Sequence, residues 1–188
     1  MTEDKQLLIN FFKTKAIDAR HFPKRAHGKK ADFELYLQND IFGYCELKSI
    51  IDYEFYGERH DPTYNKIQNK IHEAAKQFES VNPEHAKPNI VFFINHRSKI
   101  GWQDLRYVLT GQATPPNQPT EPIDLRYLNR LAKKGDLTII DYFIWADVCG
   151  TNISFATISE SKFAKELKEN ISSKAYEKIN LSGWGSGL

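Results

Sequence analysis

The sequence contains only two cysteines in 188 residues, and their surroundings do not suggest that they pair. Cys45 and Cys149 each lie in an apolar, strand-like run, and no Cys-x-x-Cys spacing is present. A disulfide framework and a cysteine-based zinc site are therefore disfavoured, and we expect a reduced, cytoplasmic setting. The six histidines are scattered as well, without the ligand spacing of a zinc hydrolase.

Other signatures of common protein classes are also missing. No apolar run approaches the roughly 20 residues that a membrane-spanning helix needs, and the first residues do not read as a signal peptide. We therefore expect no membrane association. The sequence has no Gly-x-Ser-x-Gly elbow and no Walker-type phosphate loop, which disfavours serine hydrolases and NTPases.

The composition itself is that of an ordinary globular protein. Hydrophobic residues make up 40% of the chain and charged residues 27%, so a disordered or fibrous protein is excluded. We expect a single domain over residues 1–180, with a Pro-rich insertion near 96–136 and a flexible Gly/Ser tail at 181–188. Four of the eight prolines lie within residues 111–122 of this insertion.

The most informative stretch is residues 31–51, which predicts a β-hairpin. Two runs rich in aromatic and β-branched residues, 31–38 and 41–51, flank a polar break at Gln38-Asn39-Asp40. Because strand side chains alternate, Glu46 and Lys48 share one face and Leu47 points to the other. Asp32 opens the first strand, so two acids and one lysine are predicted to meet at one place.

The remaining pattern alternates helices and strands, which predicts an α/β fold with a mixed central β-sheet flanked by helices. Residues 89–95 form a continuous apolar run typical of a strand that is buried on both faces, and we expect it to run parallel to a hairpin strand. The other expected elements are helices at 3–17, 62–80, 101–110, 124–134 and about 159–172, strands at 137–148 and 152–158, and a basic connector at 18–30.

The acids and the lysine of the hairpin resemble the signature of the PD-(D/E)xK, or restriction-endonuclease-like, nuclease superfamily. In that signature an acid on one core strand is followed by acid-x-Lys on the next, here Asp32 and then Glu46-Leu47-Lys48. Ala31 stands where the superfamily usually has proline. Two other acid-x-Lys matches, at 3–5 and 166–168, lie in segments with helical periodicity. The resemblance covers residues 1–100 best and is looser beyond them.

The resemblance implies a restriction-endonuclease-like core and a nuclease that hydrolyses DNA with Mg²⁺ or Mn²⁺. Asp32, Glu46 and the main-chain carbonyl of Leu47 would hold the metal, and Lys48 would act on the attacking water. Gln77 lies in Ala74-Ala75-Lys76-Gln77, which looks like the superfamily's Ala-x-x-Gln pattern and would orient the lysine or the water. The residue types suit this chemistry, because carboxylates are natural Mg²⁺ ligands, and Glu34 is a further candidate on the face of Asp32.

The net charge is only +2, but its distribution is uneven. Residues 13–30 contain seven lysines and arginines and a single acid, Asp18, and this basic block leads directly to Asp32. Such a block either contacts phosphates or is a solvated connector. The candidate nucleic-acid contacts are Lys24, Arg25, Lys29, Lys30, Arg59 and His60.

The sequence leaves alternatives open. One is a non-catalytic nucleic-acid or protein interaction module on the same fold, and another is an RNA nuclease or antiphage effector domain. Lys48 could also serve only as an ion-pair partner of Glu46 or Asp32. The sequence does not decide between DNA and RNA, and it leaves open a homodimer.

Overall fold

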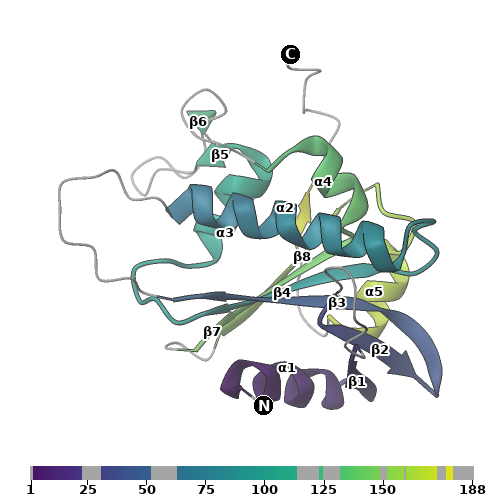
Figure 1. Cartoon of the computed structure of the whole chain (residues 1–188). Coiled ribbons are helices and arrows are strands. Elements are labelled where there is room, and N and C mark those ends of the chain that lie inside the picture. Colours follow the sequence, from purple (N-terminus) through teal and green to yellow (C-terminus); the bar gives the residue numbers. More distant parts are fainter. Residues whose placement is uncertain are drawn as a thin grey trace.

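A central β-sheet organises the chain. The computed structural model describes residues 2–22, 31–51, 63–113, 123–124, 132–148, 152–158, 160–172 and 177–179. Within these residues the sheet has seven strands in the order β1-β2-β3-β4-β7-β8-β9 (Figure 1). The strands are β1 (Ile17–His21), β2 (Phe33–Leu37), β3 (Asp40–Ile50), β4 (Asn89–Asn95), β7 (Tyr142–Asp147), β8 (Asn152–Ile158) and β9 (Glu177–Ile179). Strands β5 (Gln112–Ala113) and β6 (Ile123–Asp124) pair separately.

The sheet is mixed, as the sequence predicts. Strands β3, β4 and β7 are parallel neighbours in its centre, whereas β1, β2 and β3 form an antiparallel meander. Strand β8 is antiparallel to β7 and parallel to β9. The predicted strand at 89–95 is confirmed as β4, and all seven of its residues are buried because it lies between two parallel neighbours.

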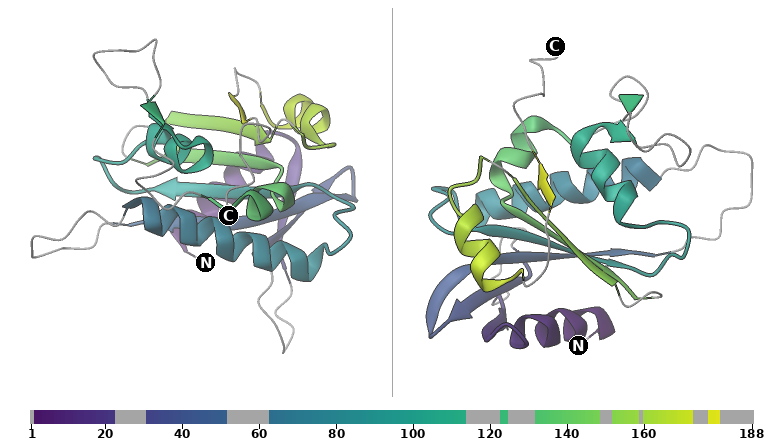
Figure 2. Two further views of the ribbon diagram at one scale, coloured as in Figure 1. Left: turned by 90° about the horizontal axis from the view of Figure 1, so that it is seen from above. Right: turned by 180° about the vertical axis from the view of Figure 1, so that it is seen from behind.

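Helices cover both faces of the sheet. On one face lie α2 (Thr63–Val81), α3 (Trp102–Thr110) and α4 (Lys134–Ile139), and on the other lie α1 (Glu3–Lys13) and α5 (Ala164–Asn170), as Figures 1 and 2 show. The α/β class with a mixed sheet flanked by helices is therefore confirmed. None of the described helices is long and apolar enough to span a bilayer.

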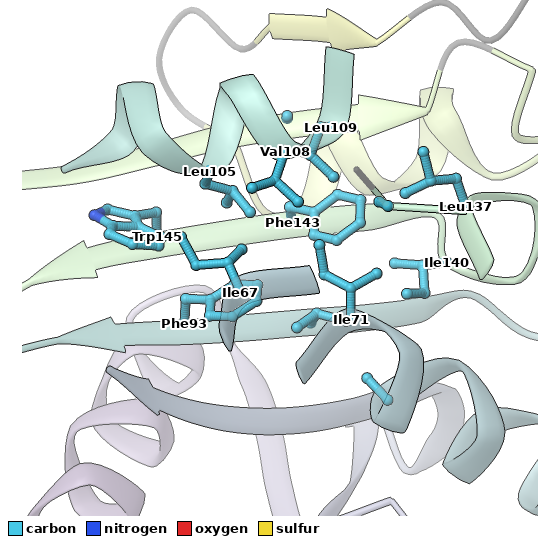
Figure 3. Packing of buried hydrophobic residues seen from close by; sticks show 14 of the residues in the cluster. Ile67, Ile71, Phe93, Leu105, Val108, Leu109, Leu137, Ile140, Phe143 and Trp145 are labelled. Carbon is cyan, nitrogen blue, oxygen red and sulfur yellow. The ribbon is translucent and has the colours of Figure 1, made fainter. Parts of the chain in front are cut away.

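Each face has its own hydrophobic core. In Figure 3, Ile67 and Ile71 of α2 pack with Leu105 of α3 against Phe93 and Trp145 of the sheet. The second core joins α1 and α5 to the opposite face. It contains Leu8, Phe12, Phe33, Phe92, Ile144 and Leu167. Because both faces are buried, the positions of the polar side chains on β3 are set by apolar packing around them.

The predicted hairpin is confirmed as β2 and β3. Gln38 and Asn39 form the turn between them, with φ of 52° and 73°, which is the conformation of a two-residue type I′ turn. Gly43 on β3 is required by close packing, because a Cβ there would lie 2.7 Å from the carbonyl oxygen of Pro88. Between the turn and Asp32 the pairing shifts by one residue at Leu35/Tyr36, and this irregularity brings Asp32 beside Glu46 rather than Cys45.

Two predicted boundaries near the N-terminus are wrong. The helix expected at 3–17 ends at Lys13, and Ile17–His21 is a strand, β1, rather than part of a connector. Ile17 and Ala19 are buried and pair with Leu37 and Leu35 of β2. This segment is only five residues long and has charged side chains at alternate positions. Its period-2 pattern is too weak to reveal a strand when the pairing partner is unknown.

The predicted strand at 137–148 also begins too early. Residues 137–139 belong to helix α4, and β7 starts only at Tyr142. A short apolar run fits either a buried helix or a strand, and here packing decides, since Leu137 is buried against α2 and α3. The helix expected at 124–134 is wrong at its first residue, which lies in β6; residues 125–131 are outside the described residues. Helix α5 is shorter than expected, and β9 was not predicted.

Candidate active site

The hairpin brings Asp32 and Glu46 together, as the sequence predicts. Asp32 immediately precedes β2, and its backbone N–H donates to Glu46 Oε2 at 3.0 Å. In return, Asp32 Oδ2 accepts a hydrogen bond from the backbone N–H of Leu47 at 3.1 Å. The two carboxylates are thus held at one point by reciprocal contacts with the opposite strand.

Lys48 extends from the same face of β3 as Glu46. Its Nζ lies 3.0 Å from Glu46 Oε1, 3.1 Å from Gln77 Oε1 and 3.6 Å from Glu73 Oε2. Both hairpin residues are buried, with exposed fractions of 2% for Glu46 and 8% for Lys48. The ammonium is therefore in hydrogen-bond range of one oxygen from the hairpin and one from α2, and the Glu73 carboxylate lies slightly farther away as an ion-pair partner.

Helix α2 completes the site. Gln77, the residue selected by the Ala-x-x-Gln resemblance, makes its predicted approach to Lys48. Glu73 was not predicted, although it lies one helical turn before Gln77 and so shares its flank of α2. Helical spacing from Gln77 is the signal that could have identified it. Its side chain is 57% exposed, so this acid lies where the site opens to solvent.

The main chain of Leu47 faces the two acids. The Leu47 N–H donates to Asp32. Because the N–H and C=O of one strand residue point to the same side of the strand, the Leu47 carbonyl also faces the side of β3 on which Asp32 lies, here called the strand edge. The Leu47 side chain packs into the opposite hydrophobic core, as the predicted alternation requires. The edge therefore presents two carboxylates and one carbonyl, all of them oxygen donors.

This donor set suits Mg²⁺ better than zinc. Within the described ranges no three His, Cys, Asp or Glu side chains gather into a metal-binding group, so no complete protein cage is present there. Mg²⁺ is usually bound by one or two carboxylates, with water and substrate phosphate supplying the remaining oxygens. Asp32, Glu46 and the Leu47 carbonyl match this pattern.

Burial strongly affects the charge of Glu46. Desolvation raises the pKa of this carboxyl group to about 7, although the Lys48 ammonium opposes the shift and the Asp32 carboxylate adds to it. A buried acid that titrates near neutrality is typical of functional sites, where ionisable groups are held in environments that stability alone would not select. Glu46 thus changes its charge close to physiological pH.

We predict a pH-dependent loss of stability that originates at Glu46. The pKa of this group in the native state, about 7, lies above its ordinary value of 4.5, so the native protein binds the proton more tightly than the unfolded chain. The free energy of unfolding should therefore fall as the pH rises between these values and level off above them, by on the order of 3 kcal/mol.

Urea denaturation in EDTA measures this effect against the matched variant Glu46→Gln, which cannot titrate. Between about pH 5 and about pH 8, the wild type should lose on the order of 3 kcal/mol more stability than the variant. Parallel pH profiles of the two proteins would contradict the assignment of the shift to Glu46.

Other candidate residues lie away from this cluster or outside the described ranges. The carboxylate of Glu34 accepts a hydrogen bond from the Tyr36 hydroxyl at 2.9 Å, and the Arg20 guanidinium stacks on the Tyr36 ring. The acid-x-Lys matches at 3–5 and 166–168 lie at helices α1 and α5, as their periodicity predicts. All six predicted nucleic-acid contacts fall outside the described residues: Lys24, Arg25, Lys29, Lys30, Arg59 and His60.

A second polar cluster was missed by sequence reasoning. Asp141 is buried before β7 and accepts hydrogen bonds from the Asn89 N–H at 2.8 Å, His85 Nε2 at 2.7 Å and the Ser161 hydroxyl. The serine proton points to the aspartate rather than to the histidine, so the three side chains do not form a nucleophilic triad. Asp141 instead ties three chain segments together beside a cavity of about 280 Å³.

The Asp32–Glu46–Lys48 cluster gathers two carboxylates and one ammonium at one place between the hairpin and α2. It combines a buried ionisable pair, an oxygen-rich strand edge and an opening toward solvent at Glu73. Comparisons of this chain with protein-family models, with curated proteins and with solved structures found no match.

Proposed function

We propose that this protein is a divalent-metal-dependent nuclease that hydrolyses phosphodiester bonds of DNA on a restriction-endonuclease-like core. The observation that carries the proposal is the position of Lys48, whose ammonium lies between Glu46 of the hairpin and Gln77 of α2 beside Asp32. A strand acid, an acid-x-Lys strand and a helix glutamine are thereby joined in three dimensions, as the superfamily resemblance requires.

In this proposal Asp32, Glu46 and the Leu47 carbonyl would hold Mg²⁺ or Mn²⁺. When bound, the cation neutralises the charge that develops on the phosphate and lowers the pKa of a bound water. Glu46 contributes as a ligand in its ionised form, which is available above its pKa of about 7. Asp32 also uses one oxygen to fix the Leu47 N–H, so it orients the strand edge as well as contributing charge.

Lys48 then orients the attacking water and stabilises negative charge on the phosphate. Its ammonium is already held by Glu46 and Gln77, so little reorganisation is needed when substrate arrives. Gln77 fixes the lysine from the helix side, and the solvent-exposed Glu73 is the contact that an incoming phosphate can displace most readily. The site is thus ordered on its buried side and open on its exposed side.

The sheet topology supports the proposed core. The acid-x-Lys strand β3 lies between the strand that follows Asp32 and the buried parallel strand β4, and α2 connects β3 with β4 across the face that carries Lys48. Strand β7 extends the parallel part of the sheet only after the insertion at 96–136.

A direct test is to incubate the purified protein with plasmid, linear duplex and single-stranded DNA, and with RNA, in Mg²⁺, in Mn²⁺ and in EDTA. We expect metal-dependent cleavage of DNA that EDTA abolishes. Binding of DNA without any turnover would instead favour a non-catalytic module, and cleavage of RNA alone would correct the substrate. The absence of both cleavage and binding under every condition would overturn the proposal.

A further inference from the structure

One flank of helix α2 carries a row of polar residues next to the candidate active site. Lys66, Lys70, Glu73 and Gln77 recur at intervals of four, three and four residues, which places them on one side of the helix. The apolar stripe of α2 faces the sheet, so this row lies beside it at the rim of the covered face.

The contacts of α2 with its neighbours fix which way the row faces. Glu73 and Gln77 both reach Lys48, so their flank of α2 is the one that overlies the hairpin. The opposite flank faces α3 and α4, because Tyr64 donates to Asp104 and His72 bonds to Asp136. Lys66 and Lys70 must therefore project on the hairpin side, continuing the row away from Gln77.

The surroundings of Lys70 disfavour its charged form. This side chain is half-buried, and its pKa is lowered by burial and by the nearby Lys48 ammonium, with Lys66 adding to the effect and Glu73 opposing it. Like charges held together at a partly buried position reduce stability. An anion bound between them would remove this repulsion.

The row continues beyond the first turn of the helix. Arg97, which follows β4, donates from its guanidinium to the hydroxyl of Thr63 at 3.0 Å, so it lies at the start of α2. From residue 77 back to residue 63 the helix rises about 21 Å. Positive side chains are therefore spread along a line that begins at Lys48 and ends near Arg97.

We propose that Lys70, Lys66 and Arg97 bind successive phosphates of the nucleic-acid strand that enters the Asp32–Glu46–Lys48 site. The inference rests on the proposed nuclease function and specifies the path of the substrate backbone along α2. Lys48 and the row on α2 then contact one continuous nucleic-acid strand. Lys70 binds the phosphate next to the reacting phosphate. These contacts are to phosphate and carry no base specificity.

The test compares Lys70→Gln and Lys66→Gln with Lys76→Gln. Lys76 lies on the exposed face of the same helix, so its variant is a matched control for loss of one charge. Binding of a labelled oligonucleotide is measured by fluorescence anisotropy in EDTA over a series of KCl concentrations, so no turnover is needed. Lys70→Gln should weaken binding several-fold and reduce the slope of log K against log[salt] by about 1, because one phosphate contact is lost.

Lys66→Gln should behave in the same way, and Lys70→Arg should retain binding because it keeps the charge. Lys76→Gln should bind like the wild type. Wild-type affinity and salt slope in both Lys70→Gln and Lys66→Gln would overturn the proposed path. If the wild type cleaves DNA and the Lys70→Gln and Lys66→Gln variants bind it as the wild type does, the proposed path is refuted and the nuclease function is not. If binding depends on these lysines but no DNA is cleaved, the nuclease function is refuted and the path is not.

Discussion

Replacing Lys48 with alanine is expected to lower the rate of DNA cleavage by roughly 10²-fold or more while leaving DNA binding and metal binding in place. The expected magnitude is that of a residue that acts on the attacking water as a general acid or base would. The carboxylates of Asp32 and Glu46 remain in this variant, so the oxygen ligands are retained. Single-turnover cleavage in Mg²⁺, with binding measured in parallel, gives both quantities.

The structure also shows Lys48 as the buried ion-pair partner of Glu46, at 3.0 Å, so the variant must be tested for a merely structural effect. Loss of the ammonium removes the interaction that lowers the Glu46 pKa, so metal binding is measured well above pH 7, where this acid is ionised. A Lys48→Ala protein that melts near the wild-type temperature and cleaves DNA at the wild-type rate would exclude this residue from catalysis.

Neutralising either hairpin acid is expected to abolish detectable cleavage and to weaken the binding of Mn²⁺. Asp32→Asn and Glu46→Gln keep the shape of each side chain but remove the charge that a divalent cation requires. The two variants should differ in stability, because only Glu46→Gln removes a buried carboxyl group whose ionisation opposes folding. Isothermal titration of Mn²⁺ into the protein without DNA measures the affinity for the metal independently of DNA cleavage.

Glu34→Gln is the matched control for these variants. Glu34 was a candidate ligand from strand alternation, but its carboxylate accepts a hydrogen bond from the Tyr36 hydroxyl. We expect it to bind Mn²⁺ and to cleave DNA like the wild type. Normal Mn²⁺ affinity in Asp32→Asn together with impaired affinity in Glu34→Gln would show that Glu34, and not Asp32, is the ligand on this side of the hairpin.

The parts of the fold that the sequence predicted are those with a strong local pattern. The Gln38–Asn39 turn separates two aromatic and β-branched runs, α2 has a clear 3.6-residue period, and β4 is apolar between its terminal asparagines. Strand β1 and helix α4 lack such patterns. Their structure depends on partners distant in sequence, since β1 pairs with β2 and Leu137 packs against α2 and α3.

The candidate site was predictable for a related reason. Glu46 and Lys48 lie on one strand, so alternation places them on one face, and the superfamily resemblance added Gln77. The position of Asp32 beside Glu46 depends in addition on the pairing of β2 with β3. Glu73 was missed because its residue type alone does not distinguish it from other exposed helix acids; only its four-residue spacing from Gln77 could have identified it. The Asp141 cluster was missed because His85, Asn89 and Ser161 come from three separate segments that only the folded chain unites.

We propose that one divalent cation, held by Asp32, Glu46 and the Leu47 carbonyl, allows this site to hydrolyse DNA. Anomalous diffraction from crystals soaked in Mn²⁺ locates such a cation directly. We expect a strong anomalous peak in contact with both carboxylates and with that carbonyl oxygen, and no peak there in Glu46→Gln crystals. Crystals of a protein that cleaves DNA, with Mn²⁺ bound at another cluster and none at this edge, would contradict it.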